Sequence, residues 1–374
     1  MISYDTLLPQ GIRSRTVPGI NGLSMHVLEA GYPESDNAPQ RPAILLLHGF
    51  PELAFSWRKV MLPLAQAGYH VIAPDQRGYG RTTGWSADYD GALEPFRVLN
   101  LVRDALGLVV ALGHSNVAAV VGHDFGSPVA AWCALLRPDV FRACVMMSSP
   151  FGGPPSLPVA VVGVDHYALA GLARPRKHYQ AYYGTRAANA DMQHCPQGVH
   201  AFLRAYYHVK SADWQVNQPH VLPSCAATEM AQMPTYYIMD ALQNMAQTVA
   251  PHMPSAAHIA ACPWLTEPEL ALYAAEYQRN GFQGGLQWYR CGAERRFITE
   301  LQTWAGRSIN VPSMFIAGQS DWGSYQKPGE FDKMQRTACT DMRSVHLVEG
   351  AGHWVQQEQP GRVAALLLEF LRGL

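Results

Sequence analysis

The segment GHDFG at residues 122–126 holds the side chain best placed to do chemistry in this chain. The apolar run 117–121 before it predicts a buried strand, and a helical pattern follows over residues 125–136. A strand, a tight turn flanked by glycines and a helix indicate a nucleophile elbow, whose central side chain stands clear of the sheet. The central residue is Asp124, in a position where hydrolases commonly have serine. We therefore expect Asp124 to be a nucleophile.

An aspartate selects a different electrophile from a serine. A carboxylate that attacks an ester or an amide yields only an anhydride, whereas on an sp3 carbon it displaces a leaving group and becomes an alkyl ester. Water can then attack the aspartyl carbonyl and release an alcohol. Asp124 thus indicates a reaction with alkyl electrophiles, either epoxides or alkyl halides. Taken alone, an aspartate here could equally be a helix N-cap, so the interpretation depends on the other loops.

Two later loops offer the acid and the base that such a mechanism needs. Asp321 follows the predicted strand 313–317, and His353 lies in a glycine-rich loop after the predicted strand 345–348. Nucleophile, acid and histidine then occur in the order found in the triads of hydrolases with an α/β sheet. We expect His353 to take a proton from water and Asp321 to orient the imidazole.

Two backbone N–H groups are candidates for an oxyanion hole. The apolar run 43–47 predicts a central strand that ends in HGFPE at residues 48–52. In a parallel sheet, ligands bind at the carboxyl ends of the strands. The N–H of Phe50 in this loop and the N–H of Phe125 beside the nucleophile could therefore both stabilise a tetrahedral oxyanion.

Strands and helices alternate over the first part of the chain and again near its end, which predicts an α/β fold with a mostly parallel sheet covered on both faces. We expect residues 1–150 and 306–374 to form the core, and residues 151–305 to form an inserted helical lid (cap) domain. Asp75 and Arg77 could pair in a structural role. The other predicted elements are an edge hairpin turning at Asn21-Gly22, strands 69–73 and 141–147, and helices 53–67, 96–112, 267–280 and 357–374.

The composition excludes several classes of function. The net charge is -1 at pH 7 and no long charged run is present, which argues against nucleic-acid binding and against an electrostatic membrane anchor. The apolar runs are too short to span a membrane, and no signal peptide is expected at the start. Seven scattered cysteines without a CxxC pair predict reduced thiols in a cytoplasmic protein. No metal, P-loop or dinucleotide motif occurs, so we expect no metal and no cofactor.

Three motifs together resemble those of the epoxide hydrolases of the α/β-hydrolase fold family. They are HGFPE at 48–52, DQRGYG at 75–80 and GHDFG at 122–126, and the resemblance covers nearly the whole chain. It implies a hydrolase that converts a small-molecule epoxide and water to a vicinal diol without a cofactor. The triad loops alone would fit haloalkane or haloacid dehalogenases as well, and a ligand-binding protein without activity is a more remote alternative.

Residues of the lid must indicate whether the substrate is an epoxide or an alkyl halide. An opened epoxide is a basic alkoxide and benefits from a proton donor such as tyrosine, whereas a halide needs only weak donors such as indole N–H groups. The segments YQAYY at 179–183 and GLQWYR at 285–290 resemble the two lid segments that carry the paired tyrosines of epoxide hydrolases. The resemblance implies Tyr179 and Tyr289 as donors, with Tyr182 or Tyr183 as alternatives to Tyr179.

The remaining expectations concern the substrate pocket. We expect Trp288, Trp354 and Tyr183 to line it. Relatives often have tryptophan at the position of Phe125, and the absence of that indole favours an epoxide over a halide. The segment 206–263 is longer than in compact members of the family, and it could line the pocket, cap it or form a homodimer contact.

Overall fold

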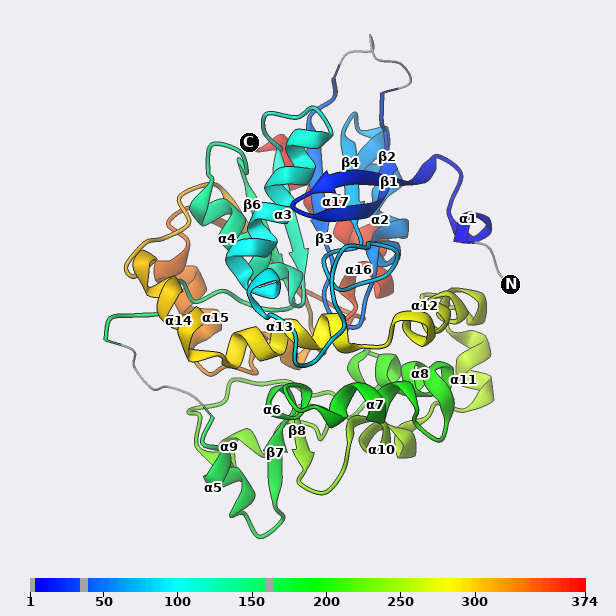
Figure 1. Ribbon diagram of the computed structural model, residues 1–374, viewed down its shortest axis with the longest axis vertical. Coiled ribbons are helices and arrows are strands. Elements are labelled where there is room, and N and C mark those ends of the chain that lie inside the picture. The colour runs from blue at the N-terminus through cyan, green and yellow to red at the C-terminus, as the bar shows by residue number, and fades with distance from the viewer. Residues whose placement is uncertain (1–3, 34–39, 159–163) are drawn as a thin grey trace.

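The computed structural model describes residues 4–33, 40–158 and 164–374. An eight-stranded sheet runs through the middle of this part, with the strand order β1-β2-β4-β3-β5-β6-β9-β10 (Figure 1). The pairings of β2 with β1 and with β4 are antiparallel and the others are parallel, which confirms the predicted α/β sheet. The strands are β1 (Ile12–Ile20), β2 (Leu23–Ala30), β3 (Ala43–Leu47), β4 (His70–Pro74), β5 (Ala119–His123), β6 (Cys144–Met147), β9 (Ser313–Gly318) and β10 (Met342–Val348).

The central strands β3, β5, β6 and β9 are buried along their whole length. Their sequences are continuous apolar runs because helices cover both faces of a parallel sheet. Strand β1 at the edge instead mixes buried and exposed positions. The hairpin between β1 and β2 turns at Asn21 and Gly22, both with positive φ, which confirms the turn predicted from the Asn-Gly pair.

Two pairs of helices cover the sheet. Helices α2 (Arg58–Gln66) and α17 (Pro360–Arg372) pack together on one face, and α3 (Val98–Ala111) and α4 (Gly126–Leu136) pack together on the other (Figure 1). Helix α4 follows β5 directly and also packs against β6. Since β5 and α4 meet at Asp124, this packing holds the turn that presents the candidate nucleophile.

The prediction of one helix over residues 357–374 is wrong in one respect, because two helices occupy this region. Helix α16 (Val355–Glu358) ends before α17 begins at Pro360. Proline has no N–H and disfavours helical backbone at the residue before it, here Gln359. Smaller differences are the 3-10 turns η1 (Ala54–Trp57) and η2 (Glu94–Phe96) ahead of α2 and α3, and a single bridge between Val117 and Phe141 ahead of β5 and β6.

In the described residues between β6 and β9, helices are the main regular structure, and this part of the chain lies at one end of the sheet (Figure 1). This is the carboxyl end of the parallel strands, because the Tyr207 hydroxyl donates a hydrogen bond of 2.9 Å to the carbonyl of Pro51 just after β3. We call residues 151–305 the lid, and the domain boundaries stay a prediction. Its elements are α5 (His166–Ala170), β7 (Arg176–His178), α6 (Tyr179–Tyr183), α7 (Ala187–Gln193), α8 (Gly198–Lys210), α9 (Ala227–Met230), β8 (Ile238–Asp240), α10 (Met245–Val249), η3 (Ala250–His252), α11 (Ala256–Ala261), α12 (Glu267–Asn280), α13 (Gln283–Ala293), α14 (Arg295–Leu301) and η4 (Gln302–Trp304).

The remaining elements are short. They are α1 (Tyr4–Leu7), η5 (Trp322–Ser324), α15 (Glu330–Lys333) and the π-helical turn η6 (Met334–Ala338). Across the described ranges, no helix has the length and apolar character needed to cross a membrane.

Candidate active site

A strained turn between β5 and α4 presents Asp124. Its φ is +51°, in the left-handed region that few residues other than glycine adopt, and aspartate is among those that tolerate it. The turn leaves no room for side chains beside Asp124, since a Cβ at Gly122 would lie 2.0 Å from the carbonyl oxygen of Gly126. The Asp124 N–H donates to the carbonyl of Met147 on the neighbouring strand at 3.1 Å, which fixes the turn to the sheet.

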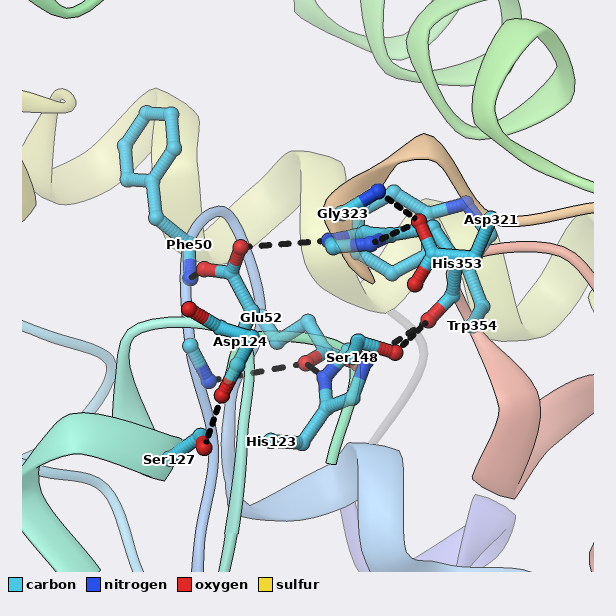
Figure 2. A network of polar contacts seen from close by, with 12 residues as sticks. Phe50, Glu52, His123, Asp124, Ser127, Ser148, Asp321, Gly323, His353 and Trp354 are labelled. Carbon is cyan, nitrogen blue, oxygen red and sulfur yellow. Dashed lines mark hydrogen bonds and ion pairs between the residues drawn. The ribbon is translucent and has the colours of Figure 1, made fainter. Parts of the chain in front are cut away.

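The three candidate triad residues lie together at the carboxyl ends of their strands (Figure 2). His353 Nε2 is 3.1 Å from Asp124 Oδ2, and His353 Nδ1 is 3.1 Å from Asp321 Oδ1. The Gly323 N–H also donates to Asp321 Oδ1, at 2.7 Å. All three side chains are buried. The arrangement therefore connects the three candidate triad residues in one hydrogen-bonded row.

Electrostatics keep the nucleophile ionised. Burial raises the pKa of Asp124, but the hydrogen bond from His353 and the positive charges of His353 and Lys210 outweigh it and hold that pKa well below its usual range. Burial likewise raises the pKa of Asp321, and the contacts with His353 and Gly323 bring it below its ordinary value. For His353, burial and the charge of Lys210 lower the pKa, while Asp321 and Asp124 raise it to a net value above 6.5.

One of the two expected oxyanion donors already contacts the nucleophile. The Phe50 N–H donates to Asp124 Oδ1 at 2.9 Å (Figure 2). The Phe125 nitrogen and Asp124 Oδ1 both lie beside Gly49, because a Cβ at Gly49 would be 2.7 Å from the first and 2.4 Å from the second. The role of the Phe125 N–H as a second oxyanion donor stays a prediction.

The two expected lid tyrosines lie near the nucleophile. The Tyr289 ring is 5.2 Å from the Phe125 ring, 5.5 Å from the Phe50 ring and 6.0 Å from the Tyr179 ring. Burial raises the pKa of Tyr289 and of Tyr179, and the charge of Asp124 raises both further. Both phenols are therefore protonated at neutral pH and can donate.

The three tyrosines of segment 179–183 differ in what their hydroxyls contact. Tyr179 donates to Gln326 Oε1 at 3.0 Å and accepts from Gln180, whereas Tyr182 donates to Asp191 and Tyr183 to Tyr206. The Asp124 charge acts on the pKa of Tyr179 in this segment, while the pKa of Tyr182 responds to Asp191. The surroundings of Tyr179 are thus those of the candidate site.

The aromatic residues expected in the pocket are all buried. The Trp288 N–H donates to the carbonyl of Arg77 at 3.0 Å and its ring lies 5.2 Å from that of Phe125. The Trp354 N–H donates to the carbonyl of Tyr207 at 2.8 Å and its ring lies 4.7 Å from that of His353. The Trp288 ring therefore packs against Phe125, and the Trp354 ring packs against His353. A direct contact of Trp288, Trp354 or Tyr183 with substrate stays a prediction.

A buried pair that the sequence analysis left without a role supports the His353 loop. Glu52 Oε2 lies 2.5 Å from His123 Nδ1, and His123 Nε2 is 2.7 Å from the carbonyl oxygen of His353 (Figure 2). Gln356 and Gln357 donate to the other Glu52 oxygen at 2.9 and 3.0 Å. Glu52 lies in the motif HGFPE and His123 in the motif GHDFG. These motif positions were the only sequence features that could have indicated a role for the pair.

Glu358 is a second supporting residue, and no sequence motif marks it. Its carboxylate accepts hydrogen bonds from the N–H groups of Gly352 and Trp354, on either side of His353, and from Ala212 in the lid, at 2.9, 2.9 and 2.8 Å. Burial raises the pKa of Glu358 to about 8. One side chain thus joins the histidine loop to the lid.

The predicted pairing of Asp75 with Arg77 is wrong. Asp75 instead contacts His26 at 2.7 Å and accepts the N–H groups of Ala54 and Arg81, while Arg77 pairs with Asp104 at 2.7 Å. The structural role expected for both residues agrees with these contacts, since each is buried and brings together segments distant in sequence. Within the described ranges, no group of three or more His, Cys, Asp or Glu side chains is arranged to hold a metal ion.

Comparisons with known proteins agree with the sequence motifs and with the geometry of the site. The family model for the α/β hydrolase fold matches residues 42–360. The chain is 34% identical over 354 residues to epoxide hydrolase A of Mycobacterium tuberculosis H37Rv, covering 95% of this chain and 96% of that protein. It is 30% identical over 367 residues to epoxide hydrolase B of the same organism, covering 94% and 96%.

Solved structures of similar proteins superpose on nearly the full length. An epoxide hydrolase from an endophytic Streptomyces matches with a TM-score of 0.77 and 31% identity, covering 98% of this chain and 96% of that one. Epoxide hydrolase A from Mycobacterium thermoresistibile matches with a TM-score of 0.75 and 32% identity, covering 97% and 99%.

Proposed function

We propose, from the premise that this chain belongs to the epoxide hydrolases of the α/β-hydrolase fold family, that it converts epoxides to vicinal diols through an alkyl ester on Asp124. The observation that carries the proposal is the contact of the Asp124 carboxylate with His353 on one oxygen and with the Phe50 N–H on the other. The first supplies a base for hydrolysis, and the second supplies a donor for the oxyanion.

In the first step, an Asp124 oxygen attacks one epoxide carbon. The bond between that carbon and the epoxide oxygen breaks, and its electron pair stays on the oxygen. Tyr289 donates a hydrogen bond to this oxygen and supplies the proton, and Tyr179 donates a second hydrogen bond once its O–H turns away from Gln326 Oε1. Their phenols remain protonated until this moment because burial and the nearby Asp124 charge raise their pKa.

In the second step, His353 Nε2 takes a proton from water, and the resulting hydroxide attacks the carbonyl carbon of the ester. The N–H groups of Phe50 and Phe125 stabilise the tetrahedral oxyanion. Its collapse breaks the bond to the alkyl oxygen, which takes the proton from His353 and leaves as the diol. The proton that remains on the Asp124 carboxyl group then returns to the tyrosine that protonated the epoxide oxygen, which regenerates the carboxylate and the phenol. Asp321 stabilises the imidazolium between these two transfers.

The lid has two roles in this scheme. Residues 151–305 carry both tyrosines to the carboxyl ends of the strands, and they exclude water from the buried triad. The indole N–H groups of Trp288 and Trp354 donate to backbone carbonyls, which leaves neither of them to bind a halide. The Trp322 N–H beside Asp321 has no partner in the described residues, so the preference for epoxides over the dehalogenase substrates rests on the two tyrosine donors.

Product analysis by mass spectrometry tests the covalent scheme. The panel contains styrene oxide, a bulky aryl epoxide, an aliphatic epoxide and matched alkyl halides. We expect the wild type to form diols without releasing halide, and Asp124→Ala to form no diol. His353→Gln should accumulate enzyme heavier by the mass of one substrate, since alkylation does not need the base. Diol formation by Asp124→Ala, or halide release with inert epoxides, would overturn the proposal.

A matched pair of lid variants belongs to the same panel. Tyr289→Phe should lose roughly 10- to 100-fold in kcat/KM because it removes a donor to the opening oxygen. Tyr182→Phe removes a hydroxyl that contacts Asp191, so its kcat/KM should stay close to that of the wild type. Equal losses in the two variants would show that the effect arises from lid packing.

A further inference from the structure

Lys210 is a buried lysine beside the triad. It is the last residue of α8 and is 3% exposed, and its carbonyl accepts a hydrogen bond of 2.8 Å from the His353 N–H. Its ammonium is surrounded by four aromatic rings, with Nζ 5.0 to 5.9 Å from the centroids of Tyr206, Tyr236, Tyr237 and Trp354. In the described residues it has no ion pair and donates no hydrogen bond.

The absence of a counter-ion distinguishes Lys210 from other buried cations of this chain. Arg58, Arg77 and Arg204 are also buried, and each forms an ion pair, with Glu269, Asp104 and Glu267 respectively. Ring faces attract an ammonium but do not replace a hydrogen-bonding partner. A buried charge without such a partner costs free energy of folding, which an anion that binds there would recover.

A second buried donor, whose ring lies beside this ammonium, also has no partner. The Tyr237 hydroxyl is buried and has no hydrogen bond in the described part of the chain, and the residue is 1% exposed. The ring of Tyr237 is the one closest to Lys210 Nζ, at 5.0 Å, and it lies 5.1 Å from the ring of Tyr179. Burial and the charges of Asp321 and Asp124 raise the pKa of Tyr237, so its hydroxyl carries a proton to donate.

The two donors belong to the same interior as the reacting groups. The charge of Lys210 lowers the pKa of both Asp124 and His353, which requires the ammonium to lie within their electrostatic range. Both also contact the Trp354 ring, which lies 5.5 Å from Lys210 Nζ and 4.7 Å from the His353 ring. Asp124 forms no ion pair with Lys210, and its two oxygens are hydrogen-bonded to Phe50 and His353.

We propose that Lys210 and Tyr237 form a carboxylate-binding subsite, and that the preferred substrates are epoxides that carry a carboxylate on the same molecule. The inference rests on the function proposed for Asp124. The ammonium pairs with the carboxylate, and the phenol donates a second hydrogen bond to it. A neutral acceptor such as an ester would satisfy Tyr237 and leave the charge of Lys210 unbalanced, which is why the anion is preferred.

The test compares two substrates that differ only in charge, 4-(oxiran-2-yl)benzoate and its methyl ester. The wild type should prefer the carboxylate in kcat/KM by roughly 10-fold or more. Lys210→Met keeps the length of the side chain and removes the charge, and it should lower the ratio of the two kcat/KM values roughly 10- to 100-fold. Tyr237→Phe should lower the same ratio by about 3- to 10-fold.

Tyr236→Phe is the matched control. Tyr236 also belongs to the ring of aromatic residues around Lys210, but its hydroxyl donates to Asn217 at 2.7 Å. Its removal should leave the ratio of the two kcat/KM values at the wild-type level. A wild type that prefers the ester, or a ratio that stays constant in Lys210→Met and Tyr237→Phe, would overturn the subsite.

The wild type also allows a test that needs no variant, which decides the matter if Lys210→Met does not fold. Benzoate should inhibit styrene oxide hydrolysis competitively and at least roughly 10-fold more tightly than benzamide. If neutral epoxides give diol but benzoate and benzamide inhibit equally, the subsite is contradicted and the function proposed for Asp124 is not. If no epoxide gives diol, the function proposed for Asp124 fails, and calorimetric titration with benzoate and benzamide then tests the subsite by itself.

Discussion

Charged groups of both signs surround the His353 imidazole, and they come from separate elements. Asp124 and Asp321 contact its two ring nitrogens, His123 contacts its carbonyl oxygen and Lys210 contributes a positive charge from α8. Burial and Lys210 lower the pKa of His353, whereas the two aspartates raise it above 6.5 in the free enzyme. This balance changes during turnover, because ester formation removes the charge of Asp124.

We expect the acid limb of kcat to lie at a lower pH than the pKa of His353 in the free enzyme. Ester formation removes a negative charge that stabilises the imidazolium, so His353 stays neutral and basic to lower pH in the intermediate. NMR titration of the imidazole gives the free-enzyme pKa, and kcat measured from pH 4 to 8 gives the limb. Asp124→Asn should lower the titrated pKa and Lys210→Met should raise it. A shift of opposite sign in either variant would contradict this assignment.

Helix α13 shows how closely an element can approach the catalytic core. It carries Tyr289, and its first turn touches the loop after β4 backbone to backbone, because a Cβ at Gly284 would lie 2.0 Å from the carbonyl oxygen of Gly78. The neighbouring Gly285 packs in the same way against the rings of Phe50 and Tyr79. The position of Tyr289 beside the rings of Phe50 and Phe125 therefore depends on a contact that only glycine allows.

Gly284→Ala should displace α13 and lower kcat/KM for styrene oxide roughly 10- to 100-fold, since a misplacement of about 1 Å costs this much in a positioned site. The control is Gly292→Ala in the same helix, where an added Cβ meets no atom within 4 Å. That variant should keep full activity and gain about 0.5–1 kcal/mol of stability from helix propensity. Kinetics and urea unfolding on both variants check this, and wild-type activity in Gly284→Ala would disprove it.

At the scale of the whole molecule, buried polar contacts join the lid to the core. Arg58 of α2 donates to Glu269 of the lid helix α12 at 2.8 Å, to Gln357 at 2.9 Å and to the carbonyl of Trp264 at 3.2 Å. Arg58 is 2% exposed. One side chain thus connects a core helix, the lid and the segment that follows the His353 loop.

Arg58→Met should lower the free energy of unfolding by about 3–5 kcal/mol, because the buried acceptors of Phe55, Gln357 and Trp264 lose their donor. Glu269 also keeps only the longer ion pair with Lys59, at 3.8 Å. Arg97→Met is the control, since the pair of Arg97 with Glu300 also joins core and lid but is partly exposed. Its cost should be at most about 1 kcal/mol. Urea unfolding followed by fluorescence measures both, and equal costs for the two variants would refute the role assigned to Arg58.

Features that depend on local spacing could be predicted from the order of residues along the chain. Asp124, Asp321 and His353 each follow a predicted strand, and the ends of parallel strands meet at one edge of the sheet, so their encounter could be anticipated. The glycines beside Asp124 and the Asn21-Gly22 turn are likewise local signals. Strand, loop and residue type suffice for such features because neighbours in the chain create them.

The tertiary structure alone decided which buried charges meet. Glu52 with His123, Arg58 with Glu269, and Arg77 with Asp104 in place of Asp75 join residues from different segments. Glu358 and Lys210 reach the site in the same way, from α16 and from the end of α8. The energy of a buried charge depends on which side chains packing brings within a few ångströms, and no spacing along the chain encodes that distance.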